Sequence, residues 1–202
     1  LVVFGRGVQG ERITLQLRHL FKDLLRMVKE TFPRNVQVET RLPADLWPVR
    51  GDLTQLYQVF LNLGVNARDA MPRGGTIRFS ATNLWLDEAR AAANPGAHPG
   101  PYLALSVADT GQGMTREVMD RIFEPFFTTK EYGQGTGLGL PTAMGIVKSH
   151  GGFISVESSL GKGSQFVVHL PALPNAPAPA PVEKTVAGAR LHGHGQLILV
   201  VD

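Results

Sequence analysis

Three short runs rich in glycine and asparagine occur in a fixed order along the chain and constrain its fold more than any other feature. They are Asn62-Leu-Gly-Val-Asn66-Ala-Arg-Asp69-Ala70, Asp109-Thr-Gly111-Gln-Gly113 and Gly135-Thr136-Gly137-Leu138-Gly139-Leu140. Glycine lets a backbone pass close to a ligand, and a glycine loop that opens a helix presents free N–H groups to phosphates. Together the runs predict a nucleotide site that does not use a P-loop.

The asparagine run falls in a helix that we expect to begin at Asp52, as N-cap, and to continue to Ala70. Asn62 and Asn66 are one turn apart and therefore lie on the same face of that helix. Asparagine is a poor residue inside a helix, but its carboxamide oxygen suits a hard cation such as Mg2+. A capping or surface asparagine is the alternative. We favour a metal-and-phosphate role for Asn66, because the other two runs are present.

Asp109 stands at the end of a strand expected over residues 102–108. Taken alone, it would be an ordinary turn aspartate. Beside the other runs, we expect its carboxylate to accept a hydrogen bond from the amino group of adenine. Gly111 and Gly113 would then leave room for the ring.

The third run immediately precedes a helix expected over residues 138–150. The free N–H groups of a first helical turn and the helix dipole attract anions, so we prefer phosphate binding to a flexible hinge here. Upstream lies Phe123-Glu-Pro-Phe126-Phe127-Thr128-Thr-Lys130, whose aromatic residues we expect to anchor one end of a lid over the nucleotide. Lys130 either reaches a phosphate or is solvated, and the sequence favours neither.

Hydrophobic periodicity predicts the remaining elements. Further helices are expected over residues 13–32 and 115–122, and a mobile loop over residues 87–100. Strands are expected over residues 36–40, 47–49, 76–82, 102–108, 153–157 and 165–170. Gly161-Lys-Gly-Ser164 is read as a hairpin turn, because Val156 stands where a P-loop requires glycine.

Composition excludes several classes of protein. The chain has no cysteine, which rules out disulfides and thiolate metal sites and fits a cytoplasmic setting. It contains no run of 18 apolar residues, so we expect no membrane-spanning helix in this sequence. The formal charge of +3 comes from scattered arginines rather than from a basic block. We therefore expect neither a nucleic-acid partner nor membrane contact for this chain.

In chain order, the asparagine run, the Asp109 run, the Phe123–Lys130 segment and the Gly135 run closely resemble the N, G1, F and G2 boxes of sensor histidine kinases. The resemblance covers residues 11–172. It implies the Bergerat ATP-binding fold, an α/β (α+β) two-layer sandwich in which a mixed sheet is covered on one face by helices. It also implies ATP or ADP with Mg2+ as the bound cofactors, and a lid over residues 114–137.

The same resemblance assigns the site residues. Asn66 matches the Mg2+ ligand, Asp109 the adenine-reading aspartate, and Ser164 a residue that reaches adenine through water. Asp69 stands where some members have a basic residue near phosphate, so that contact comes from elsewhere or is absent. Asn62, Asn66 and Lys130 are the candidates nearest the chemistry. The full set expected around the nucleotide is Asn66, Asp69, Asp109, Gly111, Gly113, Thr128, Gly135, Thr136, Gly137, Leu138, Gly139, Leu140 and Ser164.

The flanking segments extend the resemblance. Residues 1–10 are similar to the tail of the phosphoacceptor and dimerisation helix, and residues 11–172 form the catalytic domain. A Pro/Ala-rich linker follows over residues 173–195, and residues 196–202 are similar to the first strand of a receiver domain. The implied parent is a homodimeric hybrid kinase whose helical and receiver domains are the partners of this one. The sequence does not say whether that parent is anchored in a membrane.

Two alternatives remain. Topoisomerase, MutL-type and Hsp90-type ATPases share the fold but carry a glutamate, as general base for water, four residues before the Mg2+ asparagine. Here that position is Asn62, whose carboxamide cannot accept the proton. The second alternative is a nucleotide-binding module that has lost catalysis.

Overall fold

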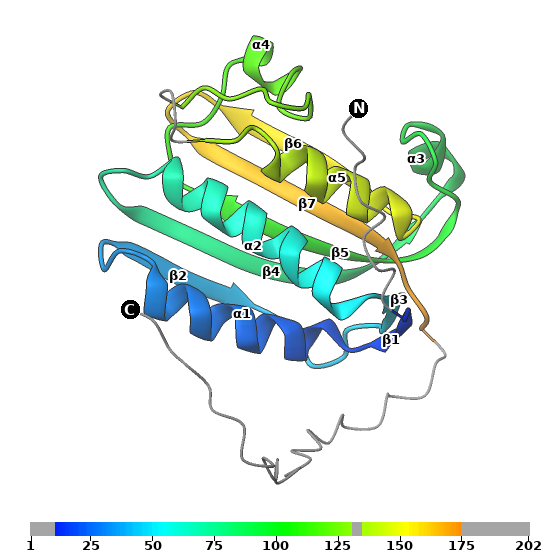
Figure 1. The fold of residues 1–202 in the computed structure, drawn as a ribbon. Coiled ribbons are helices and arrows are strands. Elements are labelled where there is room, and N and C mark those ends of the chain that lie inside the picture. Colours follow the sequence, from blue (N-terminus) through cyan, green and yellow to red (C-terminus); the bar gives the residue numbers. More distant parts are fainter. Residues whose placement is uncertain (1–10, 131–134, 175–202) are drawn as a thin grey trace, which may run out of the picture.

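A mixed β-sheet forms one layer of the molecule, and helices α1, α2 and α5 cover one of its faces (Figure 1). The computed structural model describes residues 11–130 and 135–174. Five strands lie in the order β2 (Val36–Arg41), β4 (Gly75–Leu86), β5 (Gly100–Asp109), β7 (Gly163–Pro171) and β6 (Phe153–Ser159). β2 is parallel to β4, and every other neighbouring pair is antiparallel. The predicted two-layer sandwich is confirmed.

The core lies between this sheet and helices α1 (Leu17–Thr31), α2 (Leu53–Asp69) and α5 (Gly139–Ser149). Phe21 of α1 packs on Phe60 of α2 at a ring-centroid distance of 4.8 Å, and on Phe79 of β4 at 6.0 Å. All three rings are fully buried. Burial of each ring contributes about 1.5–3 kcal/mol to stability, so this cluster fixes both helices on the sheet.

Helix α2 begins as the sequence predicts, and its first turn is tied to the end of α5. The Asp52 carboxylate accepts hydrogen bonds from the backbone N–H groups of Thr54 and Gln55, at 2.9 and 3.1 Å. The Asp52 N–H donates to His150 Nε2 at 3.1 Å, and His150 Nδ1 lies 2.8 Å from the Ile146 carbonyl oxygen. These partners assign the proton of the ring to Nδ1. His150 therefore bonds both the last turn of α5 and the N-cap residue of α2.

The N-terminal helix is shorter than predicted. Periodicity placed a helix over residues 13–32, but Ile13–Leu15 is a strand, β1, paired antiparallel with β3 (Val49–Gly51), and α1 begins only at Leu17. Apolar residues at positions 13 and 17 fit both arrangements, and tertiary pairing decides between them. β3 also begins later than the predicted 47–49, because the Trp47 N–H donates to the Asn83 side chain at 2.8 Å rather than to a strand.

The predicted loop over residues 87–100 contains a short helix, α3 (Glu88–Ala92), so that expectation was wrong in part. Asp87 caps it by accepting from the Arg90 N–H at 2.8 Å. Ala91 packs into a small second cluster with Leu86, Tyr102 and Phe153. Because Leu86 belongs to this cluster, β4 continues four residues beyond the predicted end at 82.

The helix expected over residues 115–122 is present in shorter form as α4 (Arg116–Met119), with Thr115 as its cap. None of the helices in the described ranges is long and apolar enough to cross a bilayer. The expectations for residues 1–10 and 196–202, and for most of the 173–195 linker, lie outside the described residues.

One half-buried histidine lies on the open face of the sheet. The ring of His169 in β7 stacks on Phe153 at 4.3 Å, with an interplanar angle of 9°. Nε2 is 3.1 Å from Ser155 Oγ, and Nδ1 is buried without a partner among the described residues. Burial lowers the pKa of His169 to about 4. The folded protein therefore disfavours the charged ring.

We predict a matching loss of stability in acid. The pKa of His169 is lower in the folded state than in the unfolded chain, so unfolding takes up a proton as the pH falls from about 6.5 to about 4. Allowing for the ring's partial exposure, this proton uptake lowers the free energy of unfolding by about 1–2 kcal/mol. Urea unfolding at pH 7.5 and 4.5 measures the free energy of unfolding, which should fall less between these pH values in His169→Phe than in the unchanged protein. An equal fall in both proteins would contradict the lowered pKa of His169.

Candidate nucleotide-binding site

Asp109 is held at the end of the central strand with one oxygen fixed. The residue is 8% exposed, and its Oδ1 accepts from the N–H groups of Gly111 at 2.8 Å and Ser164 at 3.3 Å. Burial raises the pKa of this carboxyl, and the two N–H donors oppose the rise. No donor among the described residues bonds Oδ2. The arrangement thus offers one oriented acceptor oxygen at the edge of the sheet.

The glycines after Asp109 are required by the protein's own backbone. Gly113 has φ of +64°, and a Cβ there would overlap the Ser159 carbonyl oxygen. A Cβ on Gly111 would lie 2.5 Å from the Ala70 carbonyl oxygen, at the end of α2. Both glycines therefore allow close packing of the loop against α2 and the β6–β7 turn. That they also leave room for a purine ring stays a prediction.

Ser164 is buried beside Asp109, to which its N–H donates. Its expected contact with adenine through water stays a prediction. Ser164 Oγ lies 3.0 Å from Ser158 Oγ, which in turn accepts from the Met114 N–H at 2.9 Å. Sequence reasoning missed Ser158, because nothing in its strand pattern marks it. The two serines connect the Asp109 loop with the start of the segment toward α4.

The two asparagines of α2 have different surroundings. Asn62 Nδ2 donates to the Gly139 carbonyl oxygen at 3.1 Å, so it joins α2 to the start of α5. Asn66 lies one turn further along α2 and is half-buried. Its side chain has no hydrogen bond to any described residue. Asn62 is therefore engaged in structure, whereas the Asn66 carboxamide is available to a ligand.

The glycine loop that opens α5 has free donors. Among the described residues, no acceptor is present for the N–H groups of Gly139 and Leu140, and Pro141 has no N–H. Thr136 Oγ1 accepts from the Leu138 N–H at 3.3 Å. Gly137 has φ of +63°, and a Cβ there would overlap the backbone of Phe126. The loop thus delivers two N–H donors at a helix N-terminus, where an anion is favoured.

The Phe-rich segment is anchored by two of its three aromatic residues. Phe123 and Phe127 pack against the core, and the Arg121 guanidinium lies 4.3 Å from the Phe127 ring centroid. Phe126 instead is 68% exposed with φ of +68°, and its N–H donates to the Gly137 carbonyl oxygen at 3.0 Å. The expected anchoring is wrong for this residue, which turns outward so that its backbone can hold the glycine loop.

Asp69 is paired with two cations. Its Oδ2 lies 2.5 Å from Lys130 Nζ, and its Oδ1 accepts from Arg68 Nε and NH2 at 2.8 and 2.7 Å. Burial alone would raise the pKa of Asp69, but Lys130 and Arg68 together hold it below its ordinary value. Thr128 Oγ1 accepts from the Lys130 N–H at 3.2 Å. Lys130 is therefore fixed, and Arg68 is a partner that sequence reasoning missed.

Comparison with known proteins decides the family. Residues 51–174 match the family described as histidine kinase-, DNA gyrase B- and HSP90-like ATPases. The chain belongs to this family. A similar curated protein is the sensor kinase CckA of Brucella abortus (strain 2308), 38% identical over 208 residues that cover 100% of this chain and 22% of the relative. Another is sporulation kinase C of Bacillus subtilis (strain 168), 36% identical over 160 residues, which are 78% of this chain and 33% of the relative.

Solved structures agree with this assignment. The catalytic domain of histidine kinase ThkA superimposes with a TM-score of 0.66 at 28% identity, covering 81% of this chain and 97% of that one. The chain is therefore an ATP-binding domain of the sensor histidine kinase kind. It spans 22% and 33% of the length of the two curated relatives named above.

We predict that Gly113→Ala destabilises this histidine kinase domain by at least about 2 kcal/mol, because the added methyl group meets a backbone oxygen at a left-handed φ. Gly145→Ala is the matched control: Gly145 lies within α5 with open space around its α-carbon. That change should stabilise the helix by up to about 1 kcal/mol. Urea unfolding measures both. A Gly113→Ala protein as stable as the unchanged one would contradict the packing described.

Proposed function

We propose that this chain binds Mg-ATP and passes the γ-phosphoryl group to a histidine on a helical domain of the same protein. The observation that carries the proposal is that three polar groups lack a partner among the described residues and belong to segments joined by α2, which bonds Gly139 through Asn62 and Gln112 through Ala70. The three groups are Asp109 Oδ2, the Asn66 carboxamide and the N–H groups at the start of α5. Base, metal and phosphate each have a suitable partner among them.

In this proposal Asp109 reads the base. Oδ1 is held by Gly111 and Ser164, which leaves Oδ2 to accept from the amino group of adenine. A carboxylate fixed by two N–H donors loses little entropy when it binds. Ser164 keeps this orientation.

The chemistry of Asn66 fits Mg2+. No cluster of three or more His, Cys, Asp or Glu side chains occurs in the described part of the chain. Mg2+ commonly binds through one or two protein ligands together with substrate phosphates and water, so a single free carboxamide is enough. When bound, the ion supplies charge neutralisation for phosphoryl transfer. The N–H groups of Gly139 and Leu140 add donors to the phosphates.

Asn62 favours transfer over hydrolysis. Its amide donates to the Gly139 carbonyl oxygen at 3.1 Å, and a carboxamide has no basic oxygen to take a proton from water. Hydrolysis of bound ATP should therefore be slow. An ATPase of the gyrase or Hsp90 kind is the second candidate, supported by the shared family description, and Asn62 argues against it.

The proposed partners are the phosphoacceptor helical domain and a receiver domain of a homodimeric parent, in the cytoplasm. A solved complex of histidine kinase ThkA with the response regulator TrrA shows such a pairing for that protein. Here the receiver aspartate would take the phosphoryl group from the histidine.

Transfer can be measured directly. The chain, mixed with labelled ATP, Mg2+ and the helical domain of its parent, should label that domain with an acid-labile, alkali-stable phosphoryl group. Asn66→Ala, which removes the metal ligand, should reduce labelling at least about tenfold. Steady release of phosphate without labelled helical domain would instead support the ATPase candidate.

We further predict that Asp109→Asn exchanges base preference. The amide oxygen can keep the bonds from Gly111 and Ser164, which turns the NH2 group toward the base. Inosine has an acceptor oxygen where adenine has its amino group. The unchanged chain should bind ADP at least about tenfold more tightly than IDP, and the variant should reverse this order. Calorimetry measures both ratios. An unaltered ADP preference in the variant would contradict the role of Asp109.

A further inference from the structure

The pairing of Asp69 with Lys130 explains an odd feature of this domain. A carboxylate close to a nucleotide's phosphates would repel them, yet Asp69 follows Asn66 by three residues on the same helix. Both oxygens of Asp69 are occupied, Oδ1 by Arg68 and Oδ2 by Lys130. One carboxylate between two cations leaves a net charge of +1 (two positive, one negative).

The location of this group follows from its neighbours along α2. On one side is Asn66. On the other is Ala70, whose carbonyl oxygen accepts from the Gln112 N–H at 3.0 Å in the loop that follows Asp109. Lys130 thus lies between the metal-binding position and the base-reading loop. In the proposed arrangement, a nucleotide that reaches from Asn66 to Asp109 would bring its α- and β-phosphates into this interval.

Lys130 is also packed against the phosphate loop. A Cβ on Gly135 would lie 3.1 Å from Lys130 Cδ and 2.8 Å from Thr128 Oγ1. The stem of the lysine is therefore confined between α2 and the first glycine of that loop. The Lys130 and Asp69 side chains are 33% and 25% exposed, so the ammonium group remains within reach of a ligand.

We propose that Lys130 binds the α- and β-phosphates of the nucleotide and that Asp69 is a positioning residue that holds it there. The inference rests on the proposed nucleotide site. An ammonium group has three N–H donors, and the Asp69 bond uses one of them. The other two are free to donate to phosphate oxygens, and Arg68 fixes the far oxygen of Asp69. The basic group that some family members have at the position of Asp69 is in this way supplied by another segment of this chain.

The test compares ADP with adenosine, which lacks the phosphates, by titration of the whole chain. Lys130→Met should weaken ADP binding about tenfold and leave adenosine binding unchanged. Asp69→Asn should weaken ADP binding several-fold by the same route. In the Lys130→Met background it should have no further effect, because Asp69 acts through Lys130. Lys130→Arg should restore most of the ADP affinity.

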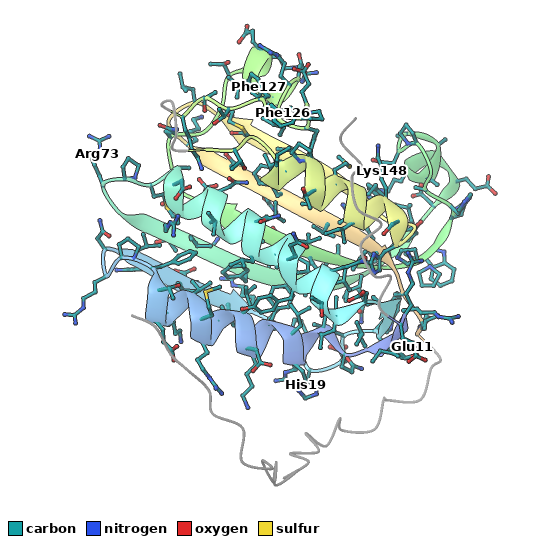
Figure 2. All side chains as sticks on the ribbon, viewed as in Figure 1. Glu11, His19, Arg73, Phe126, Phe127 and Lys148 are labelled. Atoms are coloured by element: carbon teal, nitrogen blue, oxygen red, sulfur yellow. The ribbon has the colours of Figure 1, made fainter. Side chains whose placement is uncertain are left out.

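Lys148→Met is the matched control. Lys148 is an exposed lysine in the last turn of α5 (Figure 2), at the end of that helix remote from Gly139, and its loss changes the net charge equally. ADP affinity in this variant should stay within about twofold of the unchanged chain.

Three results would overturn the inference. ADP affinity that rises in Asp69→Asn would show that the carboxylate repels phosphate instead of positioning Lys130. Equal loss of ADP and adenosine binding in Lys130→Met would assign Lys130 a structural role. If the losses of ADP affinity in Lys130→Met and Asp69→Asn add in the double variant, the two residues act independently. If ADP binds through Asp109 but Lys130→Met behaves like Lys148→Met, only this inference fails. If the unchanged chain binds neither ligand, the proposed function fails with it.

Discussion

Fixation of the Asp109 carboxylate is the constraint on which the rest of the site depends. A carboxylate that is 8% exposed at the end of a central strand is costly to bury unless donors meet it. The two donors come from the next loop and from β7, so the loop must fold back and β7 must approach closely. Glycine satisfies both demands, since a side chain at Gly113 or Gly163 would overlap backbone atoms. The packing that brings the two N–H donors to Oδ1 of Asp109 also fixes the orientation of Oδ2.

Helix α2 connects the segments that form the site. It lies across the middle of the sheet (Figure 1), and polar contacts along it reach three other segments. These contacts are Asp52 with His150, Asn62 with Gly139, Asp69 with Lys130, and Ala70 with Gln112. Because α2 is itself fixed by buried aromatic rings, the positions of metal ligand, phosphate loop and base-reading loop are set relative to one rigid element.

Much of this could be predicted from residues alone. The N-cap at Asp52 and the sheet strands with strong alternation were correct, because each depends on local chemistry. The helix start at Ile13 and the loop after Asp87 were wrong, because a strand partner far along the chain and a second hydrophobic cluster decide them. Arg68 and Ser158 were missed for the same reason: only the fold brings them to Asp69 and Ser164. The nucleotide-contact roles of the predicted site residues remain predictions.

Location of the bound nucleotide tests the account most directly. Addition of ADP and Mg2+ to isotope-labelled chain, followed by amide NMR, should move the signals of Gly111, Gly113 and Gly139 most strongly. A shallow groove on the opposite, open face of the sheet offers an internal comparison, and its lining residues Ser80, Ser106 and Gln165 should not respond. Absence of any shift, or shifts confined to that groove, would contradict the claim that Asp109 and the start of α5 hold the nucleotide between them.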